Sequence, residues 1–148
     1  MAKLVGLNEF RADLKKLIAD VPKEIAAEVR KSADRVRNGY VNRIARRGYP
    51  KPTGEKYKRG SVIHTASAAG EPPATDTGKL QGNVITKHGQ EGGKFASFVV
   101  SQMDYADDLE FGTSKMEPRP AMLPALKDET PVFEKRLAAM LKNQVEKK

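Results

Sequence analysis

The sequence predicts an α+β fold: a long N-terminal helix, then a small, mainly antiparallel sheet with a long mobile loop, and then a C-terminal helix. Apolar residues recur at helical spacing near both ends, two segments in between read as strands, and a stretch rich in glycine and proline separates the first helix from the strands. A chain of 148 residues can bury one core and leaves little room for a second. We therefore treat residues 1–148 as a single domain, with the long loop at about 48–82 inside it.

The N-terminal helix is predicted from one apolar stripe whose members are three or four residues apart. The stripe consists of Leu7, Phe10, Leu14, Leu17, Ile18, Ile25, Val29, Ala33, Val36, Tyr40 and Ile44. Pro22 is expected to bend this helix, because proline lacks the backbone N–H that the helix uses, and the helix should end before Gly48. Its other faces carry many arginines, which are typical of a solvated helix face or of a surface that meets DNA or an acidic partner.

The segment 48–82 is predicted to have little regular structure. Four prolines and six glycines interrupt it, and only Ser61 to Thr65 is expected to form a short strand. Such long loops are usually functional or mobile, and some become ordered only against a partner. Lys56, Lys58 and Arg59 make its first half basic. Nearby tyrosines could stack on bases, but ordinary loop packing is the simpler interpretation.

Two strands are predicted after this loop, at 83–87 and 95–102, joined by a Gly-rich connection at 88–94. In the second strand, apolar residues occur at both odd and even positions. This pattern predicts that both faces of the strand are partly buried.

The stretch YADDLEFGTSKMEPRPAMLPAL (Tyr105 to Leu126) predicts a short helix, a stiff link and the start of a new helix. Tyr105 and Leu109 are four residues apart and are expected to anchor the short helix to the core, and Gly112 is expected to end it. Pro120 should keep the link extended, and Pro124 suits the first turn of the next helix.

Two further features flank this stretch. Asp104 is expected to cap the short helix, with acidic residues in its first turn. The final helix has its own apolar stripe, and Pro131 is expected to bend or split it. The stripe consists of Leu126, Phe133, Leu137, Met140, Leu141 and Val145.

The net charge of +8 is unevenly distributed. Residues 1–50 contain twelve Lys and Arg against six Asp and Glu, and residues 51–100 contain seven against four. Residues 101–148 contain eight against nine. This asymmetry is compatible with contact to nucleic acid and equally with a basic face that meets an acidic face of a protein neighbour.

No catalytic or metal-binding pattern is found in the sequence. The chain has no cysteine, and its two histidines, His64 and His88, lie far from any cluster with ligand spacing. The acids at 104–110 lack the spacing of a calcium loop, and no serine has the setting of a nucleophile. No stretch approaches the roughly 20 apolar residues that span a bilayer. We therefore predict a protein that is not an enzyme and that uses no cofactor and no metal.

Three short motifs resemble the putative tail-component family of long-tailed bacteriophages, whose members are tail-completion or head-tail joining proteins. The family pattern has Pro-Pro followed by Thr-Gly-x-Leu, then Tyr-Ala-x-x-hydrophobic-Glu-x-Gly-Thr, then Arg-Pro-x-hydrophobic-x-Pro-Ala-Leu. The matching residues here are Pro72, Pro73, Thr77, Gly78 and Leu80, then Tyr105, Ala106 and Leu109 to Thr113, and then Arg119, Pro120 and Leu123 to Leu126. The order of helices and strands agrees along nearly the whole chain. One departure is Ala121, where the family usually has an aromatic residue.

The resemblance implies a structural virion protein at the junction of phage neck and tail, made in the cytoplasm of the bacterial host. It implies assembly into a ring, commonly of six subunits, that completes the tail and joins it to the head. The partners implied are other neck and tail proteins, namely a connector or stopper and the major tail protein. A nonspecific contact with DNA in the lumen is a further possibility, and no membrane is expected.

A heterologous ring needs two different faces on each subunit, and the basic and acidic segments could supply them. The contact candidates are Arg43, Arg46, Arg47, Lys56, Lys58, Arg59, Asp107, Asp108, Thr113, Ser114, Lys115, Met116 and Arg119. The segment 113–119 could equally be a mere connector. Two alternatives stay open for the whole protein: a tail terminator or other neck protein of similar fold, and a free-standing basic nucleic-acid-binding protein.

Overall fold

The computed structural model describes the backbone of residues 7–91 and 94–147, and side chains from residue 22 onward except that of residue 91. The predicted α+β fold is confirmed, with helices at both ends and antiparallel strands between them. The elements are α1 (Leu7–Ile44), β1 (Lys56–Arg59), β2 (Val62–Thr65), α2 (Lys79–Gly82), β3 (Val84–Glu91), β4 (Lys94–Ser101), α3 (Ala106–Phe111) and α4 (Met122–Glu146).

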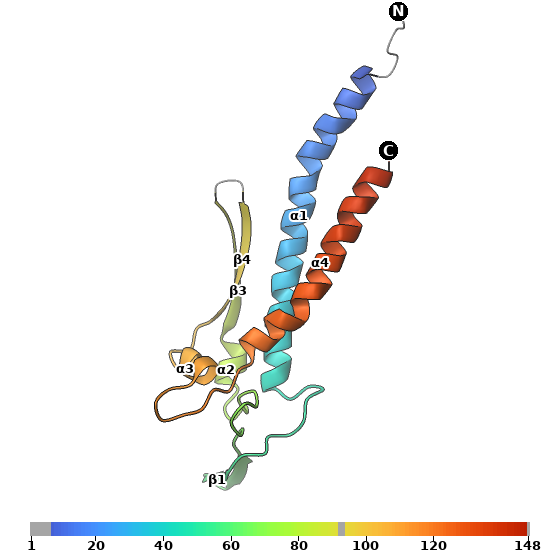
Figure 1. Cartoon of the computed structure of the whole chain (residues 1–148). Helices are drawn as coiled ribbons and strands as arrows, with labels where there is room; N and C mark the ends of the chain where they lie inside the picture. Colours follow the sequence, from blue (N-terminus) through green and yellow to red (C-terminus); the bar gives the residue numbers. More distant parts are fainter. Residues whose placement is uncertain (1–6, 92–93, 148) are drawn as a thin grey trace, which may run out of the picture.

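The two long helices, α1 and α4, are the longest elements of an elongated molecule. α4 runs alongside α1, and the hairpin of β3 and β4 packs against α1 (Figure 1). A second, smaller hairpin of β1 and β2 lies at the foot of the molecule, below the end of α1 (Figure 1). The described strands therefore form two separate two-stranded antiparallel sheets.

The core confirms the predicted stripe of α1. Val36, Tyr40 and Ile44 are buried and pack with residues from α2, β3 and the start of α4. Burial raises the pKa of Tyr40 to about 12, because the charged phenolate is disfavoured away from water. α1 is one continuous helix with Pro22 inside it. The apolar residues predicted before Pro22 have side chains outside the described set.

The predicted loop at 48–82 contains more regular structure than expected. Lys56 pairs with Thr65 and Arg59 pairs with Val62, and only Gly60 and Ser61 connect the two strands. Gly60 has φ +61°, the left-handed conformation that tight hairpin turns require. The strand expected at 61–65 is confirmed from Val62 onward. Its partner was missed, because KYKR has no apolar alternation.

Hydrogen bonds hold the rest of this loop in a defined path. The Glu71 carboxylate accepts bonds from the Thr53 hydroxyl, from the Thr53 amide at 3.1 Å and from the Ala68 amide at 2.9 Å. These bonds, led by the one from the Thr53 hydroxyl, lower the pKa of Glu71 to about 2. The Gly54 amide also donates to the Ala66 carbonyl at 2.9 Å. The turn at 53–71 is therefore organised around one carboxylate.

The second hairpin is longer than predicted. β3 continues to Glu91 and β4 begins at Lys94, so most of the expected connection at 88–94 is strand. Val99 packs against the core, whereas Phe98, which points to the other face, is 60% exposed. Its neighbours on both faces are half-buried, as predicted.

The structure corrects two predictions about α3. Tyr105, not Asp104, occupies the N-cap position, and no side chain caps the helix there. Tyr105 is 42% exposed, so it does not anchor the helix as expected; Ala106 and Leu109 pack against the core instead. The helical spacing correctly predicted that Leu109 packs against the core. Tyr105 lies before the first residue of the helix, and its side chain does not share the buried face.

The last helix is continuous through Pro131 and begins at Met122, two residues before Pro124. Its apolar stripe is only partly covered. Phe133 is half-buried, whereas Leu126 is 50% exposed. In the C-terminal half of α4, Leu141 is 39% exposed and Val145 is 69% exposed, so part of the apolar stripe lies on the surface there.

Candidate protein–protein interface

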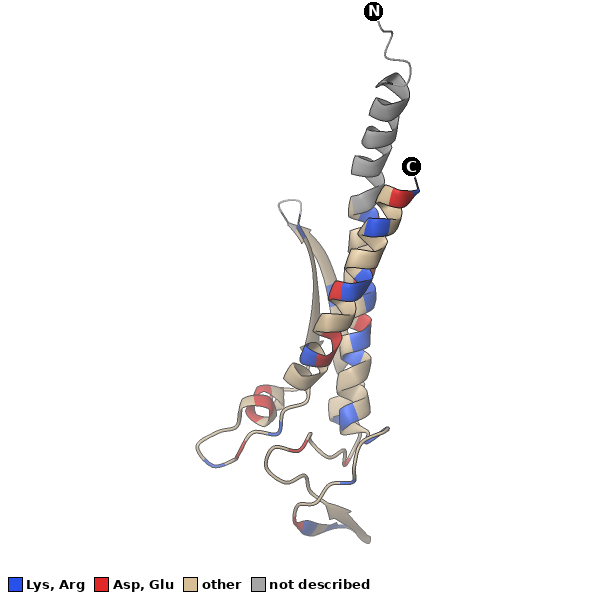
Figure 2. Cartoon of the chain, turned by 45° about the vertical axis from the view of Figure 1, so that its right-hand side comes forward, with Lys and Arg blue, Asp and Glu red and all other residues tan. Residues whose placement is uncertain are grey.

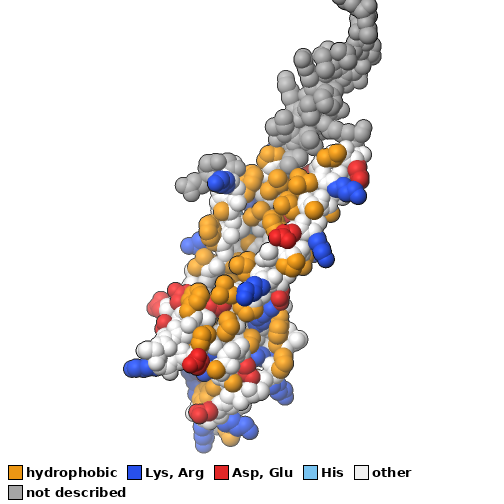
Figure 3. Space-filling model, viewed as in Figure 1, with side chains coloured by type: hydrophobic (Ala, Val, Ile, Leu, Met, Phe, Trp, Pro, Cys, Tyr) orange, Lys and Arg blue, Asp and Glu red, His pale blue; other side chains and the backbone are white. Residues whose placement is uncertain are grey.

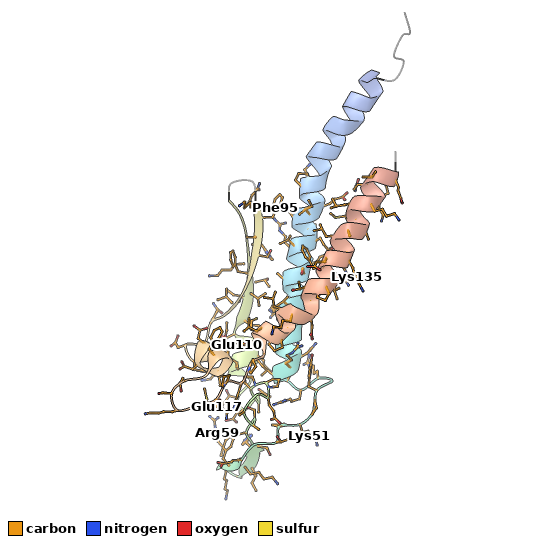
Figure 4. All side chains as sticks on the ribbon, in the orientation of Figure 1. Lys51, Arg59, Phe95, Glu110, Glu117 and Lys135 are labelled. Carbon is orange, nitrogen blue, oxygen red and sulfur yellow. The ribbon has the colours of Figure 1, made fainter. Side chains whose placement is uncertain are left out.

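The stretch from Tyr105 to Leu126 forms a structural joint centred on Glu110. Its carboxylate accepts hydrogen bonds from the amides of Ala121 at 2.9 Å, Met122 at 3.0 Å and Leu123 at 2.7 Å. These amides belong to the first turn of α4, where backbone N–H groups have no partner within the helix. Figure 4 shows Glu110 between α3 and the start of α4. One side chain of α3 thus caps the next helix.

Gly112 ends α3 in a conformation that only glycine adopts easily, with φ +77°. A Cβ atom there would lie 2.8 Å from the Met116 carbonyl oxygen and 2.9 Å from Pro118 Cδ. The chain then makes a tight turn in which the Thr113 amide donates to the Met116 carbonyl at 2.8 Å. The prediction that Gly112 terminates the short helix is confirmed.

The segment after this turn ties the joint to the central loop. The Arg119 amide donates to the Leu109 carbonyl at 2.6 Å, and its guanidinium donates from Nε to the Ser67 carbonyl at 3.1 Å. The Gly70 amide donates to the Pro118 carbonyl at 2.9 Å. Arg119 was predicted as a contact candidate, but its side chain is half-buried and bonded within the chain.

The turn itself is exposed and suits an intermolecular contact. The side chains of Thr113, Ser114 and Lys115 are exposed, and that of Met116 is half-buried. Of the four candidates, the first three are therefore accessible to a neighbour. Pro120, just after the turn, is half-buried and leads directly into α4.

The three arginines at the end of α1, all predicted as contact candidates, have different environments. Arg43 is buried, pairs with Asp128 and lies 5.1 Å from the centre of the Tyr49 ring. Arg46 is half-buried and donates to the Pro72 carbonyl at 2.6 Å. Only Arg47 is exposed. The end of α1 therefore uses two of its arginines to hold the chain itself together.

The β1–β2 hairpin carries the basic residues predicted for the loop, and these are exposed. Lys58 lies opposite Ile63 in the antiparallel register, so the two side chains and that of Lys56 share one face. Arg59, on the other face, pairs with Asp76 at 2.5 Å, and this contact lowers the pKa of Asp76. Figure 2 shows these basic positions at the foot of the molecule.

The acids Asp107 and Asp108 are exposed on α3 and form no ion pair with any described residue. Figure 3 shows acidic side chains gathered over α3, beside apolar ones. Sequence reasoning missed this apolar component. Phe111 is 65% exposed, Leu123 is 42% exposed, and Ile63 on the hairpin is 69% exposed. Ile63 and Phe111 lie in short elements, which give no periodic signal from which to find exposed apolar residues.

The described residues contain no group of three potential ligands placed to bind a metal ion. The described helices include none that is long and apolar enough to cross a membrane. Comparisons with protein-family models, with curated proteins and with solved structures find no match to this chain.

Proposed function

We propose that this protein is a structural subunit of a bacteriophage neck or tail, which assembles as a ring and joins the tail to the head. The proposal rests on the resemblance of three sequence motifs to the tail-component family. One observation carries it further: two of these motifs meet in a single interlocked joint. Glu110 of the second motif caps the helix that begins in the third, and Arg119 closes back on Leu109.

Such a joint supports an assembly role because it is built from structural residues and contains no group arranged for chemistry. The molecule also presents two surfaces of opposite charge. The β1–β2 hairpin presents Lys56 and Lys58, and α3 presents Asp107 and Asp108. A heterologous ring contact needs two different surfaces of this kind on every subunit.

The rival function, a free-standing nucleic-acid-binding protein, is favoured by the basic hairpin and by the sequence pI of about 9.7. The same hairpin could touch DNA nonspecifically inside a ring. Gel-shift titrations with a short DNA duplex distinguish the two. Binding that is weak, independent of sequence and lost steeply with salt fits the ring, whereas tight and sequence-selective binding at physiological salt supports the rival.

The proposal is tested by deleting the coding sequence from the phage genome that encodes this chain. The expected result, by electron microscopy of lysates, is filled heads and tails that remain separate. Complementation with the natural chain should restore joined particles. Normal infectious particles without the protein would refute the proposal, as would its absence from purified virions by mass spectrometry.

A further inference from the structure

The β1–β2 hairpin presents an apolar residue beside two positive charges. Ile63 is 69% exposed, and Lys56 and Lys58 are on the same face of the hairpin. Neither lysine forms an ion pair with a described residue. On the opposite face, Tyr57 stacks on His64 with ring centres 5.5 Å apart, and Arg59 pairs with Asp76. Three side chains of the second face are thus engaged within the chain, although Val62 on that face is 54% exposed. The first face presents Ile63 with the two lysines.

A hollow of complementary character lies where α3, β4 and α4 meet. Its volume is about 370 Å³, and its apolar lining includes Phe111, Met122 and Leu123. Asp104 and Asp107 line it as well, and both are exposed. The carboxylate of Glu110 also borders the hollow, but it is already bonded to the first turn of α4. The hollow thus offers an apolar floor with two carboxylates whose charge is not neutralised by described residues.

We propose that the β1–β2 hairpin of a second copy of this chain docks in this hollow. Ile63 of one copy fills the apolar floor formed by Phe111 and Leu123 of its neighbour. Lys56 and Lys58 then approach the neighbour's carboxylates. This names the subunit contact of the ring, and it therefore rests on the proposed function.

Charge complementarity favours a second copy over other occupants. The hairpin presents the apolar side chain of Ile63 next to two cations, and the hollow has an apolar lining next to two anions. A nucleic acid would satisfy the lysines but would leave Ile63 facing phosphate. Within one chain, the hairpin lies at the foot of the molecule (Figure 1), and the residues of β1 that share a pocket with Leu109 of α3 are Tyr57 and Arg59, on the face opposite Ile63. Because the hairpin and the hollow are different surfaces, a pair of copies keeps one hairpin and one hollow unused, and the contact propagates into a ring or a filament.

The absence of cysteine from the natural chain allows a direct test by disulfide formation. One preparation carries Ile63→Cys and a second carries Phe111→Cys; the two are mixed and oxidised. A disulfide forms only where the two Cβ atoms approach to about 4 Å. The matched control replaces the second preparation with Val145→Cys, whose natural side chain is 69% exposed at the far end of α4.

We expect the Ile63–Phe111 mixture to give a covalent dimer in roughly tenfold higher yield than the Val145 control, because docking raises the effective concentration of the thiols. Each preparation alone should give little dimer. All three substitutions lie at exposed positions, and circular dichroism confirms that the variants fold. A yield equal to that of the control overturns the proposal. A predominant dimer in the Ile63→Cys preparation alone also overturns it, because it would place two hairpins against each other.

Charge reversal supplies a second, independent measurement on the same thiols. Adding Lys56→Glu and Lys58→Glu to the Ile63→Cys preparation should reduce the cross-linked yield to that of the Val145 control. Adding Asp104→Lys and Asp107→Lys to the Phe111→Cys preparation should do the same. Mixing the two reversed preparations should restore the yield. Failure of this rescue overturns the docking mode.

Failure of the docking proposal can be told from failure of the proposed function. Absence of the Ile63–Phe111 disulfide, in a phage whose heads and tails separate on deletion of the gene, overturns the contact and supports the function. Formation of the disulfide, in a phage that assembles normally without the gene, supports the contact and overturns the function.

Discussion

Replacement of Glu110 by alanine is expected to destabilise the fold by about 2–4 kcal/mol. The Ala121 amide, on a fully buried residue, loses its partner, which costs about 1–3 kcal/mol for an unsatisfied buried donor. The Met122 and Leu123 amides are better placed to bond water, so they contribute less. Loss of the negative charge at the start of α4 adds about 0.3–1 kcal/mol.

Urea unfolding monitored by circular dichroism measures this change. With a slope of about 2 kcal/mol per molar urea, the midpoint should fall by about 1–2 M. Glu110→Gln retains one amide oxygen as an acceptor and should lose about 1 kcal/mol. The matched control is Asp108→Ala, because Asp108 is exposed on the same helix and its carboxylate caps nothing. Its free energy of unfolding should change by less than about 0.5 kcal/mol. Equal midpoints for Glu110→Ala and the natural chain would refute the capping role.

Three further predictions follow from local geometry. Gly112→Ala should lower the free energy of unfolding by about 2–4 kcal/mol, because Gly112 has a positive φ and a Cβ atom there would make close contacts. Gly89→Ala should change it little, because a Cβ atom there would meet nothing within 4 Å. The urea midpoints of the two variants test this difference. Because the folded pKa of Glu71, about 2, lies below its ordinary 4.5, its stabilising contribution is complete above pH 4.5 and is lost as the pH falls toward 2. The hydrogen-exchange protection factors of the 53–71 amides, which are corrected for the intrinsic exchange rate at each pH, should therefore fall over that window, and Glu71→Gln should remove this pH dependence. Arg43→Glu should lower the free energy of unfolding by about 3 kcal/mol or more, because it buries an unpaired carboxylate. Arg47→Glu, at an exposed site, should change the free energy of unfolding by less than about 0.5 kcal/mol.

The parts of the fold that the sequence predicted well are those with long periodic patterns. The stripe through Val36, Tyr40 and Ile44 gave both the helix and the core, because burial of one helix face requires that spacing. Gly112 was recognised because the conformation it adopts is accessible to few other residues. In both cases the local sequence carries the physical cause of the structure.

The β1–β2 hairpin was harder to predict, because its strands are held by pairing and not by burial. Lys56 to Arg59 carries three cations in four residues and is exposed throughout. No apolar alternation marks it, and the hairpin depends on the turn at Gly60 and on contacts such as Arg59 with Asp76. Such partners lie up to 17 residues apart, so spacing alone could not reveal them.

The candidate interface was predicted only in part, for a related reason. Charge runs identified Lys58 and Asp107, because charge is readable from composition. The exposure of Arg47 and the burial of Arg43 could not be read in the same way, because both lie in one basic run and only the fold distinguishes them. The apolar members of the interface, such as Ile63, resemble core residues in the sequence.

The joint also links stability to the proposed contact. The hollow that receives the hairpin is formed by α3, β4 and α4, and Glu110 fixes α3 against the start of α4. Loss of this cap should therefore weaken both the fold and the docking of a neighbour, whereas charge reversal at Asp107 should weaken docking alone. A Glu110→Ala variant that is destabilised but cross-links with full yield at low temperature would separate these two roles. The hollow would then be held by the core contacts of Leu109 and Met122, with Glu110 serving only to cap the helix.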